Sequence, residues 1–274
     1  MPLSQFISFM NRISIITVNR NNAVGLRKTI LSVIAQTYTN YEFILIDGAS
    51  SDQSVNIITQ YQSNISYWVS EPDAGIFNAM NKGIQQASGD YLYFLNSADA
   101  FADNDVLNKI FGRETYTAPF INGHQLNDFG NYTQRVPAMN RPLTLFDFYW
   151  GTIKHQATFI HKSMFAKYGM YDENLKITAD WKFFLQTIGL HNEQPLFTDT
   201  DIVLFQWDGI STNPQLQKEH EEERLTVLNE CIPHSIQKDY ERFHYLADYE
   251  YLLPVFKKSK LFSFLVRALV KIFK

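Results

Sequence analysis

The sequence predicts an α/β protein whose sheet is mostly parallel and flanked by helices. Four short runs have the length and the β-branched or aromatic content of buried strands, at residues 13–18, 42–47, 65–70 and 91–95. Three segments with apolar residues at helical spacing follow or separate these runs, at residues 25–36, 53–61 and 75–86. Alternating strands and helices with short connections imply parallel strands joined by right-handed crossovers.

The pattern is looser after residue 100. Short strands are expected at residues 119–123, 132–136, 158–161 and 202–206, and a helix at residues 178–190. Residues 215–253 are expected to form two helices interrupted near Pro233, the first of them highly charged. We therefore expect one large α/β domain at residues 1–212 and a helical C-terminal extension at residues 213–274.

Composition argues against several classes of protein. The net charge is −4, so nucleic acid is not an expected partner. The single cysteine, Cys231, excludes an internal disulfide and a zinc site built from cysteines, and it favours a reducing compartment such as the cytosol. The first residues lack the pattern of a signal peptide, and no apolar run of about 18 residues predicts a membrane-spanning helix.

Polar residues follow each of the four predicted strands of the first half. They lie at residues 17–20, 47–52, 71–75 and 96–99. Because the carboxyl ends of parallel strands meet at one edge of a sheet, these groups would form a polar crevice that contains several carboxylates. Asp, Asn, Gly and Ser also favour ordinary turns, so any single group has that simpler explanation.

The chemistry of such a crevice suits a nucleotide held without a glycine-rich loop. The first strand runs into TVNRNNAVG, and the chain contains neither G-x-G-x-x-G nor G-x-x-x-x-G-K-[ST], which argues against a nicotinamide site and a P-loop. Carboxylates can accept the imide N–H of a pyrimidine or bridge to ribose hydroxyls. A diphosphate beside carboxylates would be repelled unless a divalent cation such as Mg²⁺ or Mn²⁺ lay between them.

Several long segments, in order along the chain, resemble the family-2 glycosyltransferases, which have the GT-A fold. The matching segments are ISIITVNRN, LRKTILSVIAQTYTNYEFILIDGASSDQS, SEPDAGIFNAMNKGIQQASGDYLYFLNSADAF and HQATFIHKSMFAKYGMYDENLKITADWKFFLQ. The resemblance covers residues 13–211 and implies a GT-A-type, Rossmann-like catalytic domain that binds a nucleotide-sugar donor and an acceptor at residues 1–212.

The resemblance assigns roles in the nucleoside half of the donor site. It implies that Thr17 and Asn19 line the nucleoside pocket and that Asp47 contacts the base. Asp52 is either a further contact to the nucleoside or the cap of the helix that follows, where a carboxylate is favourable.

The resemblance also assigns roles around the diphosphate and the acceptor. Asp73 and Lys82 would lie beside the ribose and the diphosphate, and His155, in an HQ pair, would contact the acceptor or a donor phosphate. Asp99 matches the last acid of the family's D-x-D metal motif. Asp180 matches the general base, although a carboxylate at the start of a helix has a simpler explanation in the helix dipole.

The sequence departs from the family pattern in two places. In FLNSADAF one acid of the metal motif is missing, so we expect a site for Mg²⁺ or Mn²⁺ with Asp99 as its one carboxylate and with help from Asn96. The Q-x-x-R-W sequence of the processive polysaccharide synthases is absent, so we expect a non-processive enzyme. Trp181, next to the candidate base, either packs in the core or stacks against a sugar ring, and core packing is the favoured expectation.

The expected function is that of an inverting glycosyltransferase. It would move one sugar from a nucleotide-sugar, with UDP-sugar favoured by the resemblance, to a hydroxyl of a glycan or lipid-linked acceptor in bacterial polysaccharide or lipopolysaccharide assembly. Two alternatives remain open at this point: a sugar-1-phosphate nucleotidyltransferase, which needs a glycine-rich loop after the first strand, and a non-catalytic nucleotide-sugar-binding protein that has lost its metal site.

The C-terminal segment is basic and amphipathic. Residues 257–274, KKSKLFSFLVRALVKIFK, hold six Lys/Arg and no acid, and their large apolar residues fall on one face of a helix. Such a helix can lie in a membrane interface that carries anionic lipid, which predicts a cytoplasmic protein attached peripherally to the inner face of the cytoplasmic membrane. The alternatives are packing of this face on the protein itself or a homodimer.

Overall fold

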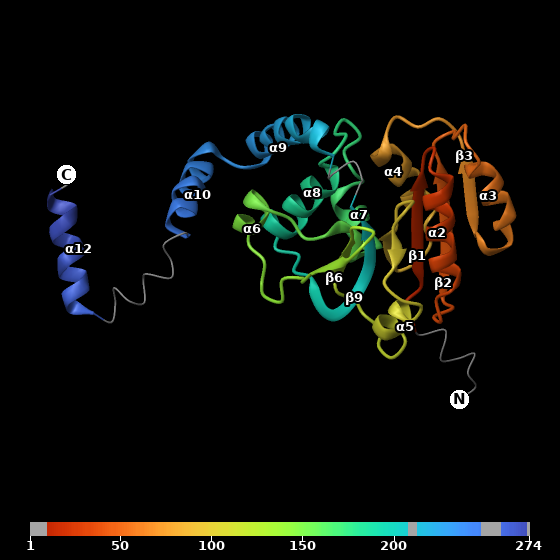
Figure 1. Cartoon of the computed structure of the whole chain (residues 1–274), viewed down its shortest axis with the longest axis horizontal. Coiled ribbons are helices and arrows are strands. Elements are labelled where there is room, and N and C mark those ends of the chain that lie inside the picture. The colour runs from red at the N-terminus through yellow and green to blue at the C-terminus, as the bar shows by residue number, and fades with distance from the viewer. Residues whose placement is uncertain (1–9, 208–212, 248–258, 273–274) are drawn as a thin grey trace. The chain divides into compact units, whose positions relative to one another are not determined.

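The computed structural model describes residues 10–207, 213–247 and 259–272 (Figure 1). The chain divides into two compact units, Met1–Leu225 and Thr226–Lys274, which we describe separately. The boundary after residue 212 that the sequence suggests stays a prediction.

The first half of the larger unit is the parallel α/β arrangement that the sequence predicts. Strands β1 (Ile13–Asn19), β2 (Tyr41–Asp47), β3 (Tyr67–Ser70) and β4 (Tyr91–Phe94) pair in parallel, in the order β3-β2-β1-β4. Three helices connect them: α2 (Ala23–Ile34), α3 (Ser54–Gln60) and α4 (Ile76–Gln86). Every residue of β1 is buried, as expected of a central strand covered on both faces.

The second half makes the sheet mixed. Strand β8 (Thr158–His161) pairs antiparallel with β4, and β6 (Phe120–Asp128) pairs antiparallel with β8. Strand β9 (Leu196–Gln206) runs parallel to β6, and the short β5 (Ala100–Phe101) and β7 (Thr133–Val136) lie antiparallel to β9 and β6. The sequence is right about an α/β fold, but the parallel arrangement is confined largely to the first four strands.

Short helices surround this second half. Three of them have no counterpart in the sequence prediction: α5 (Val106–Phe111), α6 (Leu145–Trp150) and α7 (Lys162–Tyr168). The helix expected at residues 178–190 forms as α8 (Ala179–Phe184) followed by a π-helical segment, η3 (Leu185–Leu190). Short 3₁₀ turns occur at η1 (Gln62–Asn64), η2 (His155–Ala157) and η5 (Pro214–Leu216).

Aromatic side chains fill the core beside β4. Tyr93 stacks between Phe101 and Phe159, with ring centroids 5.1 and 4.4 Å away. Phe94 and Phe159 are fully buried. Each buried aromatic contributes roughly 1.5–3 kcal/mol by removal from water, so this cluster anchors the end of β4 where the polar stretch 96–99 begins.

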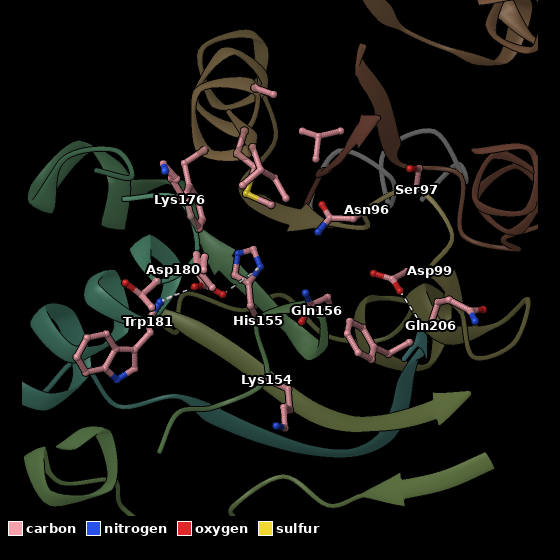
Figure 2. Close-up of a pocket in the computed structure, with 18 of the residues that line it drawn as sticks. Asn96, Ser97, Asp99, Lys154, His155, Gln156, Lys176, Asp180, Trp181 and Gln206 are labelled. Carbon is pink, nitrogen blue, oxygen red and sulfur yellow. Dashed lines mark hydrogen bonds and ion pairs between the residues drawn. The ribbon is translucent and has the colours of Figure 1, made fainter. Parts of the chain in front are cut away.

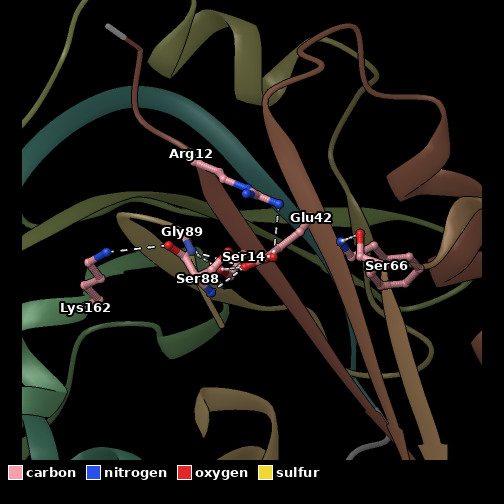
Figure 3. A network of polar contacts seen from close by, with 8 residues as sticks. Arg12, Ser14, Glu42, Ser66, Ser88, Gly89 and Lys162 are labelled. Atoms are coloured by element: carbon pink, nitrogen blue, oxygen red, sulfur yellow. Dashed lines mark hydrogen bonds and ion pairs between the residues drawn. The ribbon is translucent and has the colours of Figure 1, made fainter. Parts of the chain in front are cut away.

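The buried carboxylate of Glu42 links the N-terminal ends of β1, β2 and β4, at the edge of the sheet far from the polar strand ends (Figure 3). Glu42 is 7% exposed and accepts hydrogen bonds from Ser14 Oγ at 2.6 Å, from Ser88 N at 2.6 Å and from Gly89 N at 3.1 Å. Arg12 Nη2 lies 3.2 Å from Glu42 Oε2. Burial alone would raise the pKa of Glu42, but the hydrogen bonds from Ser14 and Ser88 hold it below its usual range.

The C-terminal helices are α9 (Gln217–Cys231), α10 (His234–Ala247) and α12 (Lys260–Ile272). The break between α9 and α10 falls at Pro233, as expected, and Gln237 Nε2 donates to Ile232 O at 2.8 Å across it. The end of the second helix predicted at residues 215–253 lies outside the described residues. In the described ranges, no helix is both long and apolar enough to cross a membrane.

Candidate active site

A cavity of about 940 Å³ opens beyond the carboxyl ends of β1 and β4. Figure 2 shows Asn96 and Asp99 on one side of it and Asp180 with Trp181 on the other, with His155 and Gln156 between them. All the residues that line it belong to the larger unit. Thus the structure brings the candidate metal residue and the candidate base to the two sides of one cavity.

Asn19, at the end of β1, presents a buried acceptor at the cavity. It is 4% exposed and lines the cavity, and its Nδ2 donates to Asp47 Oδ1 at 2.7 Å. That contact fixes the amide, because only the nitrogen can donate to a carboxylate. Within the described part of the chain, Asn19 Oδ1 is buried and has no hydrogen-bond partner. A ligand with an N–H or O–H donor would satisfy it.

Asp47 lies behind Asn19 instead of lining the cavity. It is fully buried, and it accepts hydrogen bonds from Asn19, from Ser50 N at 2.9 Å and from Ser70 Oγ at 2.6 Å. A direct contact between Asp47 and the base stays a prediction. The Asp47 carboxylate orients Asn19.

Three other predicted residues also lie outside the cavity lining. Thr17 is fully buried and donates to Leu95 O at 2.7 Å. Asp52 accepts from Ala23 N and from Ser54 N, each at 2.9 Å, so it caps the starts of α2 and α3; the Ser54 hydrogen bonds lower its pKa. The Lys82 ammonium lies 2.7 Å from a carboxylate oxygen of Glu71 and donates to Pro72 O at 3.0 Å, which holds the loop before α4.

Asp73 does line the cavity, next to the end of β2. It accepts from Gly75 N at 3.1 Å, and Arg20 Nη1 lies 4.0 Å from its Oδ1. A Cβ at residue 48 would lie 2.3 Å from Asp73 Oδ2, so glycine at this position gives the carboxylate its room.

The stretch 96–99 forms a constrained turn with oxygen atoms at the cavity. Asp99 is 4% exposed, and its Oδ1 accepts from Gln206 N at 2.9 Å, which links the turn to the end of β9. Ala98 has φ +89°, a region that costs a residue with a side chain about 1 kcal/mol or more. Thr29 holds the turn, since its hydroxyl donates to Asp99 O at 2.6 Å and accepts from Ala98 N at 3.1 Å.

Asn96 and Asp99 fit a hard divalent cation as part of its ligand set. Asn96 lines the cavity, and its Oδ1 is buried and has no hydrogen-bond partner among the described residues. One amide oxygen and one carboxylate are ligands that Mg²⁺ and Mn²⁺ accept, with the remaining positions left to substrate phosphates and water. In the same described residues there is no group of three or more His, Cys, Asp or Glu side chains arranged to hold a metal ion.

Asp180 occupies the first turn of α8 at the other side of the cavity. Its side chain is 29% exposed, its Oδ1 accepts from Trp181 N at 2.8 Å, and its Oδ2 lies 4.0 Å from His155 Nδ1. Trp181 is 3% exposed and donates from Nε1 to Phe148 O at 2.8 Å. The expectation that Trp181 packs in the core is confirmed, and that packing anchors the turn that carries Asp180.

His155 is more enclosed than its predicted role suggests. It is 4% exposed, its Nε2 lies 2.8 Å from Tyr171 Oη, and its ring stacks on Phe94 with centroids 5.0 Å apart. Burial lowers its pKa, so the ring is neutral near pH 7. Both nitrogens face protein groups, which leaves little room for the direct phosphate or acceptor contact that the sequence suggested.

The sequence analysis missed three residues of α9 that belong to this site. His220 and Arg224 line the cavity; the Arg224 guanidinium lies over the Trp181 ring at 4.0 Å, and burial lowers its pKa. Glu223 accepts hydrogen bonds from the backbone N–H groups of Lys176, Ile177 and Thr178. In the sequence these residues sit in the run KEHEEER, where a half-buried glutamate that binds another segment looks like its solvated neighbours.

Comparisons with known proteins identify the family. The family model described as Glycosyl transferase family 2 matches residues 14–168, more than half of the chain. An uncharacterized glycosyltransferase of Mycobacterium tuberculosis is 38% identical over 182 residues, which are 64% of this chain and 68% of that one. A PGL/p-HBAD biosynthesis glycosyltransferase of Mycobacterium bovis is 28% identical over 187 residues, 62% of this chain and 67% of that one.

Solved structures agree on the fold. TarS of S. aureus in complex with UDP-GlcNAc has a TM-score of 0.57 at 16% identity, over 71% of this chain and 58% of that one. The mannosyltransferase PcManGT of Pyrobaculum calidifontis, in complex with GDP-Man and Mn²⁺, has a TM-score of 0.56 at 12% identity, over 75% of this chain and 60% of that one. Together with the family match, the shared GT-A fold shows that this chain is an enzyme and belongs to glycosyltransferase family 2.

Proposed function

We propose that the protein is an inverting, non-processive glycosyltransferase that moves one sugar from a UDP-sugar to a hydroxyl of a glycan or lipid-linked acceptor. One observation carries the proposal: a single cavity has Asn19, Asn96 and Asp99 on the donor side and Asp180 on the other. We propose that the enzyme acts in surface polysaccharide or lipopolysaccharide assembly, and the relative named for PGL/p-HBAD biosynthesis supports this role.

Asp180 serves as the general base of a single displacement. The acceptor hydroxyl attacks the anomeric carbon as the bond to the diphosphate breaks, which inverts the configuration of that carbon. Asp180 takes the proton of the attacking hydroxyl, a role that requires a partly exposed carboxylate at the acceptor side of the cavity. The protonated Asp180 returns its proton to water after the product leaves.

Asn19 and Asp73 hold the nucleoside. The unpartnered Asn19 Oδ1 accepts the imide N–H of uracil, and Asp47 keeps the amide in that orientation through its bond to Nδ2. Asp73, with room provided by Gly48, lies where it can accept from the ribose hydroxyls. The TarS complexes with UDP and with UDP-GlcNAc support UDP as the nucleotide. The PcManGT complex with GDP-Man makes GDP the nucleotide to test against it.

Asn96 and Asp99 would hold Mg²⁺ or Mn²⁺ beside the donor diphosphate. The unpartnered Asn96 Oδ1 supports this, and so does the Mn²⁺ complex of PcManGT. The chemistry that such a cation would supply is neutralisation of the negative charge on the departing nucleoside diphosphate. Gln206 N fixes the Asp99 carboxylate and so sets the direction in which its oxygens face.

The C-terminal helix α12 attaches the enzyme to the inner face of the cytoplasmic membrane. On this helix, Leu261 is 71% exposed and Phe264 is 67% exposed, and Arg267 and Lys271 are exposed as well. Six cations without an acid in residues 257–274 complement an anionic lipid surface better than a protein surface. A homodimer through this face is the competing outcome.

A donor panel tests the enzymatic proposal. UDP-, GDP- and dTDP-sugars are compared by thermal shift and by hydrolysis, with Mn²⁺, Mg²⁺ or EDTA. We expect UDP-sugars to give the largest shift and Asn19→Ala to weaken UDP binding about tenfold, the effect of one lost hydrogen bond. Gln60→Ala, on the exposed face of α3, is the matched control. Equal UDP affinity in Asn19→Ala and the control would remove Asn19 from the donor site.

A vesicle experiment tests membrane attachment. The chain without residues 257–274 is compared with the full chain by sedimentation with phosphatidylglycerol vesicles, and with phosphatidylcholine vesicles as control. We expect the full chain alone to sediment, and only with the anionic lipid. Equal sedimentation of both chains would refute the attachment, and concentration-dependent self-association lost on truncation would show a dimer instead.

A further inference from the structure

Three side chains in contact, Tyr171, His155 and Asp180, form a row from the core to the proposed general base. Tyr171 Oη lies 2.8 Å from His155 Nε2, and His155 Nδ1 lies 4.0 Å from Asp180 Oδ2. In Figure 2, His155 and Asp180 stand side by side on the cavity wall. This row of side chains comes from the loop after α7, the 3₁₀ turn η2 and the first turn of α8.

The imidazole ring cannot turn freely. Phe94, at the end of β4, stacks on one side of it with an interplanar angle of 28°. Phe184 of α8 and Tyr171 pack at 5.9 and 5.7 Å from its centroid. A flip of this buried ring would break the contact with Tyr171, so the positions of Nδ1 and Nε2 are set by packing.

The surroundings also select the tautomer. Burial raises the pKa of Tyr171, so its phenol is neutral and its hydroxyl needs an acceptor. Among the described residues, His155 Nε2 is the acceptor within hydrogen-bonding distance of that hydroxyl. With Tyr171 as the donor, Nε2 is bare and Nδ1 carries the proton, which then faces the carboxylate of Asp180 4.0 Å away; this tautomer is part of the inference.

We propose that His155 is a positioning residue for Asp180, with its Nδ1–H directed at Oδ2 and its tautomer fixed by Tyr171. The inference rests on Asp180 being the base. The 4.0 Å separation closes to a hydrogen bond when an acceptor fills the cavity, as catalytic contacts commonly tighten on substrate binding.

The two donors then hold the plane of the carboxylate. Trp181 N already donates to Oδ1 at 2.8 Å, and His155 Nδ1 donates to Oδ2. Each oxygen keeps a lone pair, and the one that faces the acceptor takes its proton. His155 keeps its own proton throughout, so Asp180 alone changes protonation state in the transfer. Fixing such geometry before the reaction is a recognised source of rate.

Two substitutions separate this role from a purely structural one. Asparagine places its amide nitrogen near the position of Nδ1, whereas glutamine places its amide near the position of Nε2. Both variants lose the stacking on Phe94. His155→Asn therefore keeps the donor toward Asp180, and His155→Gln keeps the partner of Tyr171. Donor hydrolysis is measured with the UDP-sugar that gives the largest thermal shift.

We expect His155→Gln to lower kcat about tenfold to a hundredfold and His155→Asn less than about fivefold, with the donor KM unchanged in both. If glutamine is the milder substitution, His155 acts on Tyr171 alone and the inference fails. If Asp180→Asn keeps full turnover, the proposed base fails instead, so the two failures are distinguishable.

Nitrogen-15 NMR of the ligand-free protein gives a readout that needs no substrate. We expect the His155 signals to show a bare Nε2 and a protonated Nδ1, and Tyr171→Phe to produce a mixture of tautomers. A protonated Nε2 in the unmodified protein would overturn the inference, whatever the kinetics show.

Discussion

Glu223 of α9 is expected to hold the segment that carries the base. Its Oε1 accepts from Lys176 N at 2.7 Å, and its Oε2 accepts from Ile177 N, Thr178 N and Thr178 Oγ1 at 3.0 to 3.1 Å. Thr178 is the N-cap residue of α8, and Asp180 follows two residues later. Replacing Glu223 should therefore disturb both folding stability and turnover.

The size of the effect follows from the bonds that each variant retains. Glutamine can keep the three bonds to Oε2, but its NH₂ group faces Lys176 N, so one bond and the negative charge are lost. We expect Glu223→Gln to cost about 1.5 kcal/mol of unfolding free energy, the lower end for a bond to a charged acceptor because the site is partly exposed. Alanine removes all four bonds and should cost about 3 kcal/mol.

Urea unfolding and donor hydrolysis measure the two consequences. We expect kcat to fall about tenfold in Glu223→Gln, because a displaced base loses its alignment with the acceptor. Glu221→Gln is the matched control, an exposed glutamate on the same helix whose carboxylate accepts from Gln217 at 3.0 Å. If Glu223→Gln matches this control in both stability and kcat, Glu223 does not hold the segment that carries Asp180.

Three further outcomes are expected. Glu42→Gln should cost about 2 kcal/mol of unfolding free energy at pH 7. Because folding lowers the pKa of Glu42 from 4.5, the ionised carboxylate stabilises the fold above pH 4.5, and this stabilisation is lost as the pH falls through the lowered pKa. The unfolding free energy of the variant should therefore fall less on acidification than that of the unmodified protein. Gly48→Ala should displace Asp73 and raise the Kd for UDP several-fold in calorimetry, with the melting temperature nearly unchanged. Asp99→Asn keeps an acceptor for Gln206 N, so it should lower Mn²⁺-stimulated hydrolysis at least about tenfold without unfolding; unaltered Mn²⁺ stimulation would exclude the metal role.

The first half of the fold is predictable because buried parallel strands are continuous apolar runs. Strands β1, β2 and β4 lie within about a residue of the predicted limits for this reason. Strand β6 is longer than predicted because its second part carries polar residues such as His124 and Gln125, which are buried only through pairing with β9. Such pairing depends on residues far away in the chain, which a local pattern does not contain.

The site divides in the same way. Asn19, Asp73 and Asn96 follow directly from strand ends, and the structure brings them to one cavity. Asp47 has the same position in the pattern, but Ser50 and Ser70 saturate its carboxylate, and no property of the residue itself reveals this. The contribution of α9 was missed for a similar reason, since helical spacing does not show which glutamate meets the backbone of another segment.

Turnover of the Asp180→Asn variant shows whether Asp180 is the general base. Asparagine has the same shape and can still accept from Trp181 N, but it cannot take a proton from the acceptor. Hydrolysis of the best UDP-sugar, UDP affinity and melting temperature are measured on the same preparation. We expect kcat to fall at least about a hundredfold, with UDP affinity and melting temperature unchanged. Turnover within about twofold of the unmodified enzyme would contradict this role of Asp180.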